Sequence, residues 1–540
     1  MGAKVLPHRR RFSVATVLLL ATSIFVLTHN TAFFAHVTEV YPLNIHYAPF
    51  ILSLALVLGT STYLVLAVLC VGRATKPILT VLLLLSAAAS YYMNRYGVVI
   101  DHEMVRNVAL TDSREVRDVV HWGLVLHLIL LGVVPAVVLM LLPVERTSFL
   151  TETVSKLKFV LGALALTAFA VVPISDTYFS FLREHKILRY YANPTGWLYA
   201  TFKFLKQSAR SPNEAVAPLG EEARVHPSDV DRELIIVVVG ETARADHFSL
   251  NGYERQTNPK LQAENVLSFT NVSSCGTSTA VSVPCMFSNL GRAGYSQSKG
   301  ANTENVLDVL QHAGISVLWR DNNSDSKGVA ERVPFEDFRS PQRNPICDVE
   351  CRDEGMLAGL DNYIEQIPEG DIVIVLHAMG NHGPAYFKRY PAAFEQFTPA
   401  CKSAELDTCS PEEIRNAYDN AILYTDHFLS EVIRFLKPYS SRFETAMLYL
   451  SDHGESLGEA GVFLHGMPYF IAPDAQTHVA AIVWFGSSFE IDTAGLRSQI
   501  ANPYSHDNLF HSLLGLLEIE DPVYDKGKDI FAGHYTEEDE

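Results

Sequence analysis

The chain has 540 residues, which is too long for one ordinary compact domain and indicates at least two bodies, each with its own core. Its formal net charge of −18 is unevenly placed. Residues 1–208 hold 18 basic and 10 acidic side chains, which leaves 24 basic and 50 acidic side chains for the remainder. A region of net charge +8 is therefore joined to one of −26, which argues against nucleic acid as a partner.

The first region contains five apolar runs, each near the roughly 20 residues that a helix needs to cross a bilayer. They cover residues 12–34, 48–71, 77–96, 119–143 and 159–174. Arginines at positions 9 to 11 precede the first run, as they would in a cleaved signal peptide. Because four further runs follow, we predict instead a transmembrane domain of five helices over residues 1–176.

The charges beside these runs predict an orientation. The basic N-terminus, the loop with Arg73 and Lys76, and the loop after residue 143 all lie in the cytoplasm if the first span runs outward. The opposite loop, residues 95–118, mixes arginines with acidic residues, so the charge pattern is imperfect. An odd number of spans places everything after residue 174 outside the cytoplasm.

Cysteine spacing gives an independent indication of the compartment. Cys70 lies within a predicted span, and the other six cysteines form three close pairs in the soluble part. Outside the cytoplasm thiols oxidise, so we expect three local disulfides. Zinc binding is the alternative, but cysteine-rich zinc sites usually join two short-spaced pairs, and these pairs lie about fifty residues or more apart. The pairs are Cys275 with Cys285, Cys347 with Cys351, and Cys401 with Cys409.

Residues 177–232 are expected to connect the two bodies. Residues 179–206 mix aromatic and basic side chains and are interrupted at 194–196, a pattern typical of helices on a membrane surface. A helix that docks on the soluble domain fits the same pattern. Residues 209–232 are rich in Ala, Glu, Pro and Ser and are expected to form a linker.

From residue 233 onward, short β-branched runs alternate with helical stretches, which predicts a mostly parallel sheet covered by helices. Strands are expected at residues 234–239, 316–319, 372–376, 446–450 and 480–484, and a long amphipathic helix at 412–436. Residues 233–540 are therefore predicted to form a soluble α/β domain.

Polar clusters follow four of these strands at the points where they end. In open α/β sheets, ligands bind outside the carboxyl ends of the strands, so we expect the clusters to meet at one site. They are Gly240-Glu241-Thr242, Arg320-Asp321-Asn322-Asn323, His377 with Asn381-His382-Gly383, and Ser451-Asp452-His453-Gly454.

Two of these clusters contain ligands suited to zinc. Glu241 and the Asp452-His453 pair offer carboxylate oxygen and imidazole nitrogen. Each alone is typical of a cap or surface turn, and it is their joint placement at strand ends that favours a metal site. A hydroxyl-rich stretch, residues 273–285, is a candidate source of a nucleophile beside that metal, as covalent phosphoryl transfer requires. Its ordinary alternative is an N-cap or a solvated turn, and the pattern does not choose among Thr277, Ser278, Thr279 and Ser282.

Several longer motifs together carry a specific resemblance. They are GETARAD at 240–246, CGTSTA at 275–280, RDNNSDSK at 320–327, HGP at 382–384, SDHGES at 451–456 and HG at 465–466. This set resembles the lipid A phosphoethanolamine transferases, which include the polymyxin-resistance enzymes, and the resemblance covers essentially the whole chain. It implies five spans in the bacterial inner membrane, followed by a periplasmic domain of alkaline-phosphatase-like fold.

The resemblance also implies roles for individual residues. Thr279 would be the nucleophile, and Glu241, Asp452 and His453 would join it in binding Zn²⁺. The remaining assignments are His382 and His465 for a phosphate or a second metal, Asn323 and Lys327 for the transferred group or substrate, and Asn107, Thr111 and Glu115 for the donor lipid. The last three have the i, i+4, i+8 spacing of one helix face, and a polar loop helix without a role is the alternative.

The implied activity is zinc-dependent transfer of phosphoethanolamine from phosphatidylethanolamine to a lipid A phosphate, through a covalent intermediate on Thr279. The transfer would lower the negative charge of the outer membrane and confer polymyxin resistance, and we expect the enzyme to act as a monomer. Three alternatives remain. A lipopolysaccharide core sugar is the alternative acceptor, and phosphoglycerol, as in the lipoteichoic-acid enzymes, is the alternative cargo. A membrane sensor that has lost catalysis is the alternative class of protein.

Overall fold

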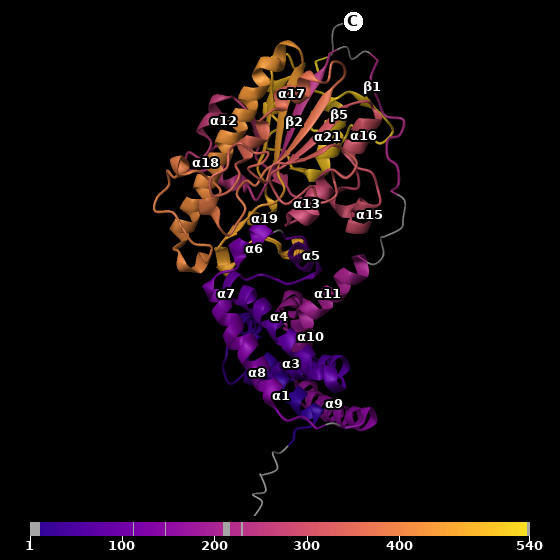
Figure 1. Cartoon of the computed structure of the whole chain (residues 1–540), viewed down its shortest axis with the longest axis vertical. Coiled ribbons are helices and arrows are strands. Elements are labelled where there is room, and N and C mark those ends of the chain that lie inside the picture. Colours follow the sequence, from indigo (N-terminus) through magenta and orange to yellow (C-terminus); the bar gives the residue numbers. More distant parts are fainter. Residues whose placement is uncertain (1–10, 112, 146, 209–215, 228–230, 537–540) are drawn as a thin grey trace, which may run out of the picture. The chain divides into compact units, whose positions relative to one another are not determined.

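The computed structural model describes residues 11–111, 113–145, 147–208, 216–227 and 231–536 (Figure 1). The chain divides into two compact units. The first comprises Met1–Val105 and Val120–Leu205, and the second comprises Arg106–Val119 and Lys206–Glu540. The short segment Arg106–Val119 therefore groups with the C-terminal residues, although it lies between two apolar runs. The expected boundaries at residues 176 and 232 stay a prediction.

The first unit is built from helices. Four described helical stretches are long and apolar enough to cross a membrane: Ala48–Leu69, Gly72–Tyr96, Trp122–Leu141 and Phe149–Phe179. A fifth span results only if α1 and α2, which meet at a bend of 53°, are counted as one. Five spans therefore stay a prediction. The helices are α1 (Val14–Thr28), α2 (Thr31–Val40), α3 (Ala48–Leu69), α4 (Thr75–Tyr96), α7 (Trp122–His127), a π-helical stretch (Leu128–Val133), α8 (Val134–Leu141), α9 (Phe149–Val171), α10 (Ser175–Glu184) and α11 (Thr195–Ser208).

A buried pair of asparagines ties the bend between α1 and α2 to the segment before α11. Asn30 Nδ2 donates to the backbone carbonyl of Asn193 at 2.6 Å, and the backbone N–H of Asn193 donates back to Asn30 Oδ1 at 2.8 Å. The Trp197 indole then donates to Asn193 Oδ1 at 3.1 Å. Because these polar groups are buried and bonded, they hold the start of α11 within the first unit. Whether this segment lies on the membrane surface or docks on the soluble domain stays a prediction.

The second unit contains a seven-stranded sheet in the order β3-β11-β8-β2-β7-β5-β6. The strands from β8 to β6 run parallel, and β11 is antiparallel to both of its neighbours. The five strands expected from the sequence all lie in this sheet, with ends shifted by at most two residues. The strands are β2 (Glu233–Gly240), β3 (Leu267–Phe269), β5 (Ser316–Asp321), β6 (Phe335–Asp337), β7 (Ile372–His377), β8 (Glu444–Ser451) and β11 (Ala481–Phe485).

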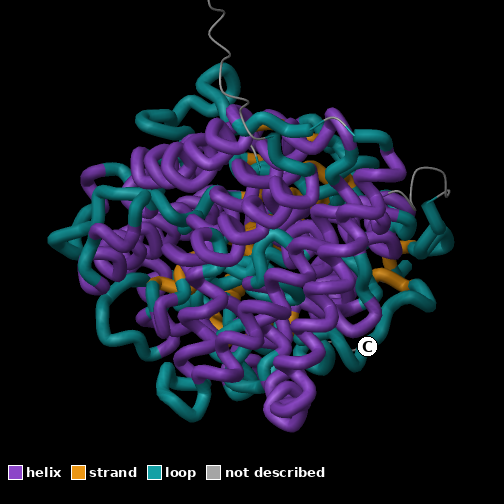
Figure 2. The backbone as a smooth tube through the Cα atoms, turned by 90° about the horizontal axis from the view of Figure 1, so that it is seen from below, coloured by secondary structure: helices purple, strands orange, loops and turns teal. Residues whose placement is uncertain are grey.

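Helices cover both faces of this sheet. Helices α13, α16 and α21 pack with Ile235, Val237 and Val239 of β2 in one hydrophobic core, and α18 lies over the other face (Figure 1). Figure 2 shows the backbone from below, with helices in purple, strands in orange and loops in teal. The helices of this unit are α5 (His102–Leu110, which spans the unit boundary), α6 (Ser113–Val119), α12 (Pro259–Ala263), α13 (Thr279–Met286), α14 (Gly291–Gly294), α15 (Gln297–Ala301), α16 (Val306–His312), α17 (Leu360–Glu365), α18 (Pro411–Leu436), α19 (Asp474–Thr477), α20 (Thr493–Arg497) and α21 (Leu509–Leu516).

Local chemistry explains where the long helix α18 begins. Ser410 accepts from the Glu413 amide, and the Glu413 carboxylate accepts in return from the Ser410 amide, so two end groups of the helix are satisfied. Pro411 at the first helical position has no amide hydrogen to leave unpaired. The three expected cysteine pairs form disulfides, Cys275–Cys285, Cys347–Cys351 and Cys401–Cys409, while Cys70 is buried and free.

Candidate active site

The register of two neighbouring strands brings Glu241 and Asp452 together. Gly240 at the end of β2 pairs with Ser451 at the end of β8, and the Asp452 amide donates to the Gly240 carbonyl at 3.0 Å. Strands β8, β2, β7 and β5 are consecutive in the sheet and parallel, so all four predicted polar clusters lie at one edge.

Glu241, Asp452 and His453 form a compact, fully buried group. One ligand atom from each lies within 4.8 Å of the others. His453 Nε2 is 3.4 Å from Glu241 Oε1 and 3.3 Å from Asp452 Oδ2. The other ring nitrogen, Nδ1, donates to the Gly454 carbonyl at 2.9 Å. Burial, with the nearby His465 adding to it, holds the pKa of His453 well below its usual value, so the ring is neutral and its Nε2 lone pair faces the carboxylates.

Thr279 is the hydroxyl that reaches this group. It is the first residue of α13, and its Oγ1 donates to Glu241 Oε2 at 3.0 Å and lies 3.3 Å from His453 Nε2. Thr277, another of the four candidates, instead donates to the Met467 carbonyl at 2.6 Å. The start of α13 therefore distinguishes two hydroxyls that the sequence pattern leaves equivalent.

The donor set fits a zinc ion. Asp452 Oδ2 is buried and has no hydrogen-bond partner among the described residues. Burial raises the pKa of Asp452, since a carboxylate without water or a cation beside it favours the neutral form. Two carboxylates, a neutral imidazole and a hydroxyl within this space are the ligand types and number of a tetrahedral zinc site.

A glycine allows the backbone to approach Glu241 closely. Gly380 has a φ of +49°, and a Cβ atom at this position would lie 2.9 Å from the Glu241 carbonyl oxygen and 3.1 Å from its Cβ. A larger residue would therefore both strain the turn and push Glu241 out of place.

Asn323 bonds to this group, whereas Lys327 bonds to its own loop. Asn323 Nδ2 donates to Glu241 Oε2 and to the Ala378 carbonyl, each at 2.8 Å, so this amide orients the Glu241 carboxylate. The Lys327 ammonium donates to the Ser324 carbonyl at 2.9 Å. In this structure, Asn323 thus contacts a candidate ligand residue directly.

Comparisons with known proteins show the family to which the chain belongs. A family model described as Sulfatase matches residues 233–519, and one described as Phosphoethanolamine transferase EptA/EptB matches residues 58–209. The chain is 40% identical over 534 residues to the phosphatidylethanolamine transferase Mcr-1 of Escherichia coli, a match that covers 96% of this chain and 97% of that protein. The chain belongs to the phosphoethanolamine transferase family.

Two further relatives extend the match to the whole transferase. The phosphoethanolamine transferase EptA of E. coli K12 is 37% identical over 538 residues, which is 98% of each chain. The integral membrane protein lipooligosaccharide phosphoethanolamine transferase A (EptA) from Neisseria meningitidis is 34% identical, with a TM-score of 0.93 over 97% of this chain and 100% of that one. The transferase thus has the expected architecture of a membrane region followed by an alkaline-phosphatase-like domain.

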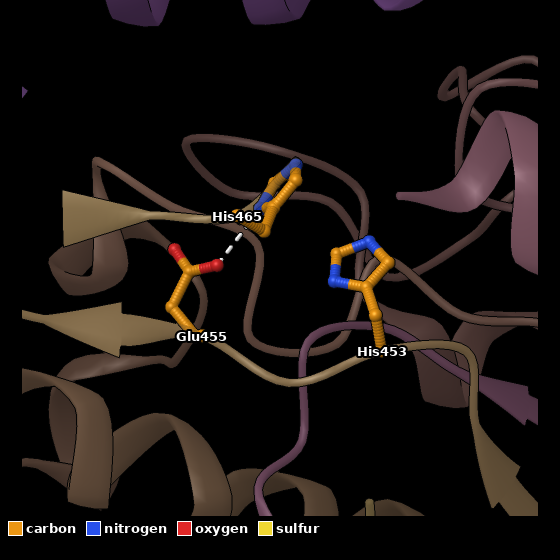
Figure 3. A group of neighbouring side chains, drawn as sticks. All are labelled: His453, Glu455 and His465. Atoms are coloured by element: carbon orange, nitrogen blue, oxygen red, sulfur yellow. Dashed lines mark hydrogen bonds and ion pairs between the residues drawn. The ribbon is translucent and has the colours of Figure 1, made fainter. Parts of the chain in front are cut away.

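A second group of possible metal ligands, His453, Glu455 and His465, shares His453 with the first (Figure 3). Glu455 Oε2 accepts from His465 Nδ1 at 2.8 Å, and the Tyr386 hydroxyl donates to Glu455 Oε1 at 2.7 Å. The rings of His453 and His465 are 4.3 Å apart, and those of His465 and His382 are 5.6 Å apart. The structure therefore brings His382 and His465 together as predicted.

Glu455 is a residue of the transferase site to which the sequence analysis assigned no role. It lies within the SDHGES motif, so its place beside Asp452 and His453 in the chain was the available signal. By holding His465 Nδ1–H, Glu455 leaves the other nitrogen of that ring as the one that can accept a proton or bind a metal.

His506 is a second residue that sequence reasoning missed. Its Nδ1 accepts from the Cys275 amide at 3.1 Å, and its Nε2 donates to the Ser451 carbonyl at 2.9 Å. Burial lowers its pKa to about 4, which keeps it neutral. It thereby joins the loop that precedes Thr279 to the end of β8, and no motif near position 506 indicated this.

The three residues expected to contact the donor lipid are not on one helix. Helix α5 ends at Leu110 and α6 begins at Ser113, so the expectation of a single helix face is wrong. The Thr111 hydroxyl donates back to the Asn107 carbonyl at 2.7 Å, a side-chain bond that competes with continued helix. Asn107 and Thr111 belong to the second unit, and the side chain of Glu115 lies outside the described residues.

Proposed function

We propose that this transferase moves phosphoethanolamine from phosphatidylethanolamine to a phosphate of lipid A, with Thr279 as the nucleophile. The observation that carries the proposal is the Thr279 hydroxyl, 3.0 Å from Glu241 and 3.3 Å from His453 at the start of α13. The names of the relatives support both the donor and the acceptor of the reaction. The E. coli protein is named for phosphatidylethanolamine, and the N. meningitidis protein is named for a lipooligosaccharide.

Glu241, Asp452, His453 and Thr279 are the residues that would hold a Zn²⁺ ion. When bound, zinc supplies Lewis acidity and lowers the pKa of a hydroxyl that it contacts. Asn323 keeps the Glu241 carboxylate oriented through its 2.8 Å hydrogen bond, and the Gly454 carbonyl keeps the His453 ring in the tautomer that exposes Nε2.

In the first step, the Thr279 oxygen attacks the phosphorus of phosphatidylethanolamine and displaces the diacylglycerol oxygen. One proton passes from the threonine hydroxyl to the leaving oxygen, and Glu241 Oε2, which accepts the hydroxyl hydrogen bond, is its first acceptor. The products are diacylglycerol and phosphoethanolamine bound to Thr279. Because Thr279 is the first residue of α13, the positive end of the helix dipole favours a phosphate there.

In the second step, an oxygen of the monoanionic lipid A phosphate attacks the phosphorus of the intermediate and displaces the Thr279 oxygen, and the P–OH proton of that lipid A phosphate passes to the Thr279 oxygen. His382 and His465 lie beside His453 and stabilise the charge on the phosphate oxygens or hold a second metal ion. The added ethanolamine ammonium offsets a lipid A negative charge, which weakens binding of cationic polymyxins and confers resistance.

The reaction requires the catalytic unit to lie on the periplasmic side of the inner membrane, where both lipids are present. The three disulfides of the second unit support an oxidising compartment. The apolar helices of the first unit support an integral membrane position.

Mass spectrometry of lipid A tests the proposal. Cells that make the wild-type protein should gain lipid A carrying one added phosphoethanolamine, and cells that make Thr279→Ala at equal abundance should not. A modified core sugar with unchanged lipid A would overturn the acceptor, and an added phosphoglycerol would overturn the cargo. Equal modification by the Thr279→Ala variant would overturn the nucleophile.

A further inference from the structure

A buried arginine joins three segments of the second unit that are far apart in the sequence. Arg389 follows the short 3-10 turn Tyr386–Lys388, and its side chain is 3% exposed. Its Nε donates to the His382 carbonyl at 2.6 Å, its Nη1 donates to Glu350, and its Nη2 donates to Asp118 Oδ2 at 2.7 Å. The guanidinium fork is thereby filled by one carbonyl and two carboxylates.

The charges around Arg389 balance only when Asp118 is present. The C-terminal residues contribute three basic side chains to this cluster, Arg352, Lys388 and Arg389, and two described acidic partners, Asp348 and Glu350. Asp118 supplies the third carboxylate and bonds both Lys388 and Arg389. Because an unpaired buried charge is costly, the cluster formed by the C-terminal residues of the second unit is complementary to one further carboxylate, which the segment Arg106–Val119 of the same unit supplies.

Asp118 comes from the segment that carries the candidate donor-lipid residues. It is 8% exposed and lies in α6, near the end of Arg106–Val119, which also contains Asn107 and Thr111. Burial alone would lower the pKa of Arg389, but the carboxylates of Glu350 and Asp118 raise it, so the guanidinium stays charged. The contact is therefore a buried, charge-assisted pair and not a screened surface one.

The same arginine reaches the transferase site through His382. Its bond to the His382 carbonyl fixes the backbone that carries the His382 ring, and this ring lies 5.6 Å from that of His465. One side chain thus bonds both the donor-lipid segment and a loop of the site.

We propose that Asp118 and Arg389 form a latch that holds the segment Arg106–Val119 on the catalytic unit. Arg389 acts as a positioning residue that sets the donor headgroup against His382. This inference rests on the proposed function, since it assigns a role in using phosphatidylethanolamine. The donor contacts and the nucleophile then stay at a constant separation while the acceptor enters and leaves.

Hydrogen exchange of the full chain tests the latch directly. The variants are Asp118→Asn, which keeps the shape and removes the charge, and Arg389→Lys, which keeps the charge and removes the fork. Amides of residues 106–119 should exchange about tenfold faster or more in both variants, as expected from losing a buried charge-assisted hydrogen bond. The matched control is Asp337→Asn, which removes an ion pair with Arg339 in the same unit and should leave this exchange unchanged.

Steady-state kinetics test the positioning role. With vesicles of phosphatidylethanolamine as donor and lipid A as acceptor, Asp118→Asn should lower kcat/KM for the donor about tenfold, while the KM for lipid A and the bound zinc stay at wild-type values. A general loss of structure would change all three. Arg389→Lys should show the same changes. If Arg389→Lys does not fold, Asp118→Asn alone still tests the positioning role.

The exchange measurement tests the latch, and the donor kinetics test the positioning role of Arg389. Unchanged exchange of residues 106–119 in Asp118→Asn would overturn the latch. Faster exchange with unchanged donor kinetics would leave a structural ion pair and overturn the positioning role. A wild-type enzyme that transfers nothing from phosphatidylethanolamine would overturn the proposed function, and the exchange measurement would still decide the latch.

Discussion

Gly240 and Ser451 lie directly opposite one another at the carboxyl ends of the parallel strands β2 and β8. The residues that follow them, Glu241 and Asp452, therefore leave the sheet side by side, and the Thr242 amide donates to Asp452 Oδ1 at 3.2 Å. This pairing places the carboxylates of two distant motifs where a single cation can contact both. The site depends on the register, because a shift of one residue would turn the side chains to opposite faces.

We expect Thr279→Ala to lower transfer by about 10⁴-fold or more, because the nucleophile is removed while the surrounding site is kept. Thr279→Ser should keep measurable activity, since it retains the hydroxyl. Ser282→Ala, which removes another buried hydroxyl of α13, is the matched control and should keep most of the activity. The measurement is transfer of labelled phosphoethanolamine to lipid A by purified full-length protein. Activity of Thr279→Ala near that of the control would exclude Thr279 as nucleophile.

Asp452→Asn should release zinc. The substitution removes a carboxylate charge from the group that also contains Glu241 and His453, and a neutral amide is a poor zinc ligand. Elemental analysis of the purified full chain should find zinc in the wild type and little in the variant. Asp426→Asn, at a buried carboxylate that accepts from the amides of Lys260 and Leu261, should keep its zinc. Equal zinc in Asp452→Asn and the wild type would contradict the assignment.

The Cys275–Cys285 disulfide encloses Thr279 and should be needed for activity, whereas the Cys401–Cys409 disulfide should contribute to stability alone. Cys275–Cys285 and Cys401–Cys409 close loops of similar length, with separations of 10 and 8 residues. Loss of either should lower the free energy of unfolding by about 2–3 kcal/mol through loop entropy. Since Thr279 lies within the first loop only, a double serine variant at that pair should lose transfer activity, and the variant at the second pair should not. Equal activities of the two variants would show that the Cys275–Cys285 disulfide does not position Thr279.

His506 predicts a pH dependence of stability. Burial lowers its pKa from 6.5 to about 4, so between these values the unfolded chain binds a proton that the folded chain does not. The stabilising contribution is therefore complete above about pH 6.5 and is lost as the pH falls toward 4. His506→Gln keeps one acceptor and one donor without titrating. Thermal unfolding of the full chain should show a smaller loss of Tm over this range for the variant, and equal slopes would rule out His506 as the titrating group.

Much of the fold could be predicted from the sequence because its determinants are local. The alternation of β-branched runs with helical stretches located five strands of the central sheet, and the Ser410, Pro411 and Glu413 signals agree with the observed start of α18. The short strands β3 and β6 were missed, since three residues carry too little periodicity. The break between α5 and α6 was also missed, because the i, i+4, i+8 spacing of polar residues alone does not show where a helix ends.

The sequence by itself determined the opposite charges of the two regions, the apolar runs, the cysteine pairs and the motifs that carry the family resemblance. These are properties of composition and of spacing along the chain. Only the tertiary structure decided which hydroxyl meets Glu241, that Glu455 orients His465, and that Asp118 bonds Arg389 across a separation of 271 residues. The physical reason is that a hydrogen bond requires two atoms within about 3 Å of each other and in the right direction. Strand register and buried charges set this distance and this direction, and neither leaves a pattern in the sequence.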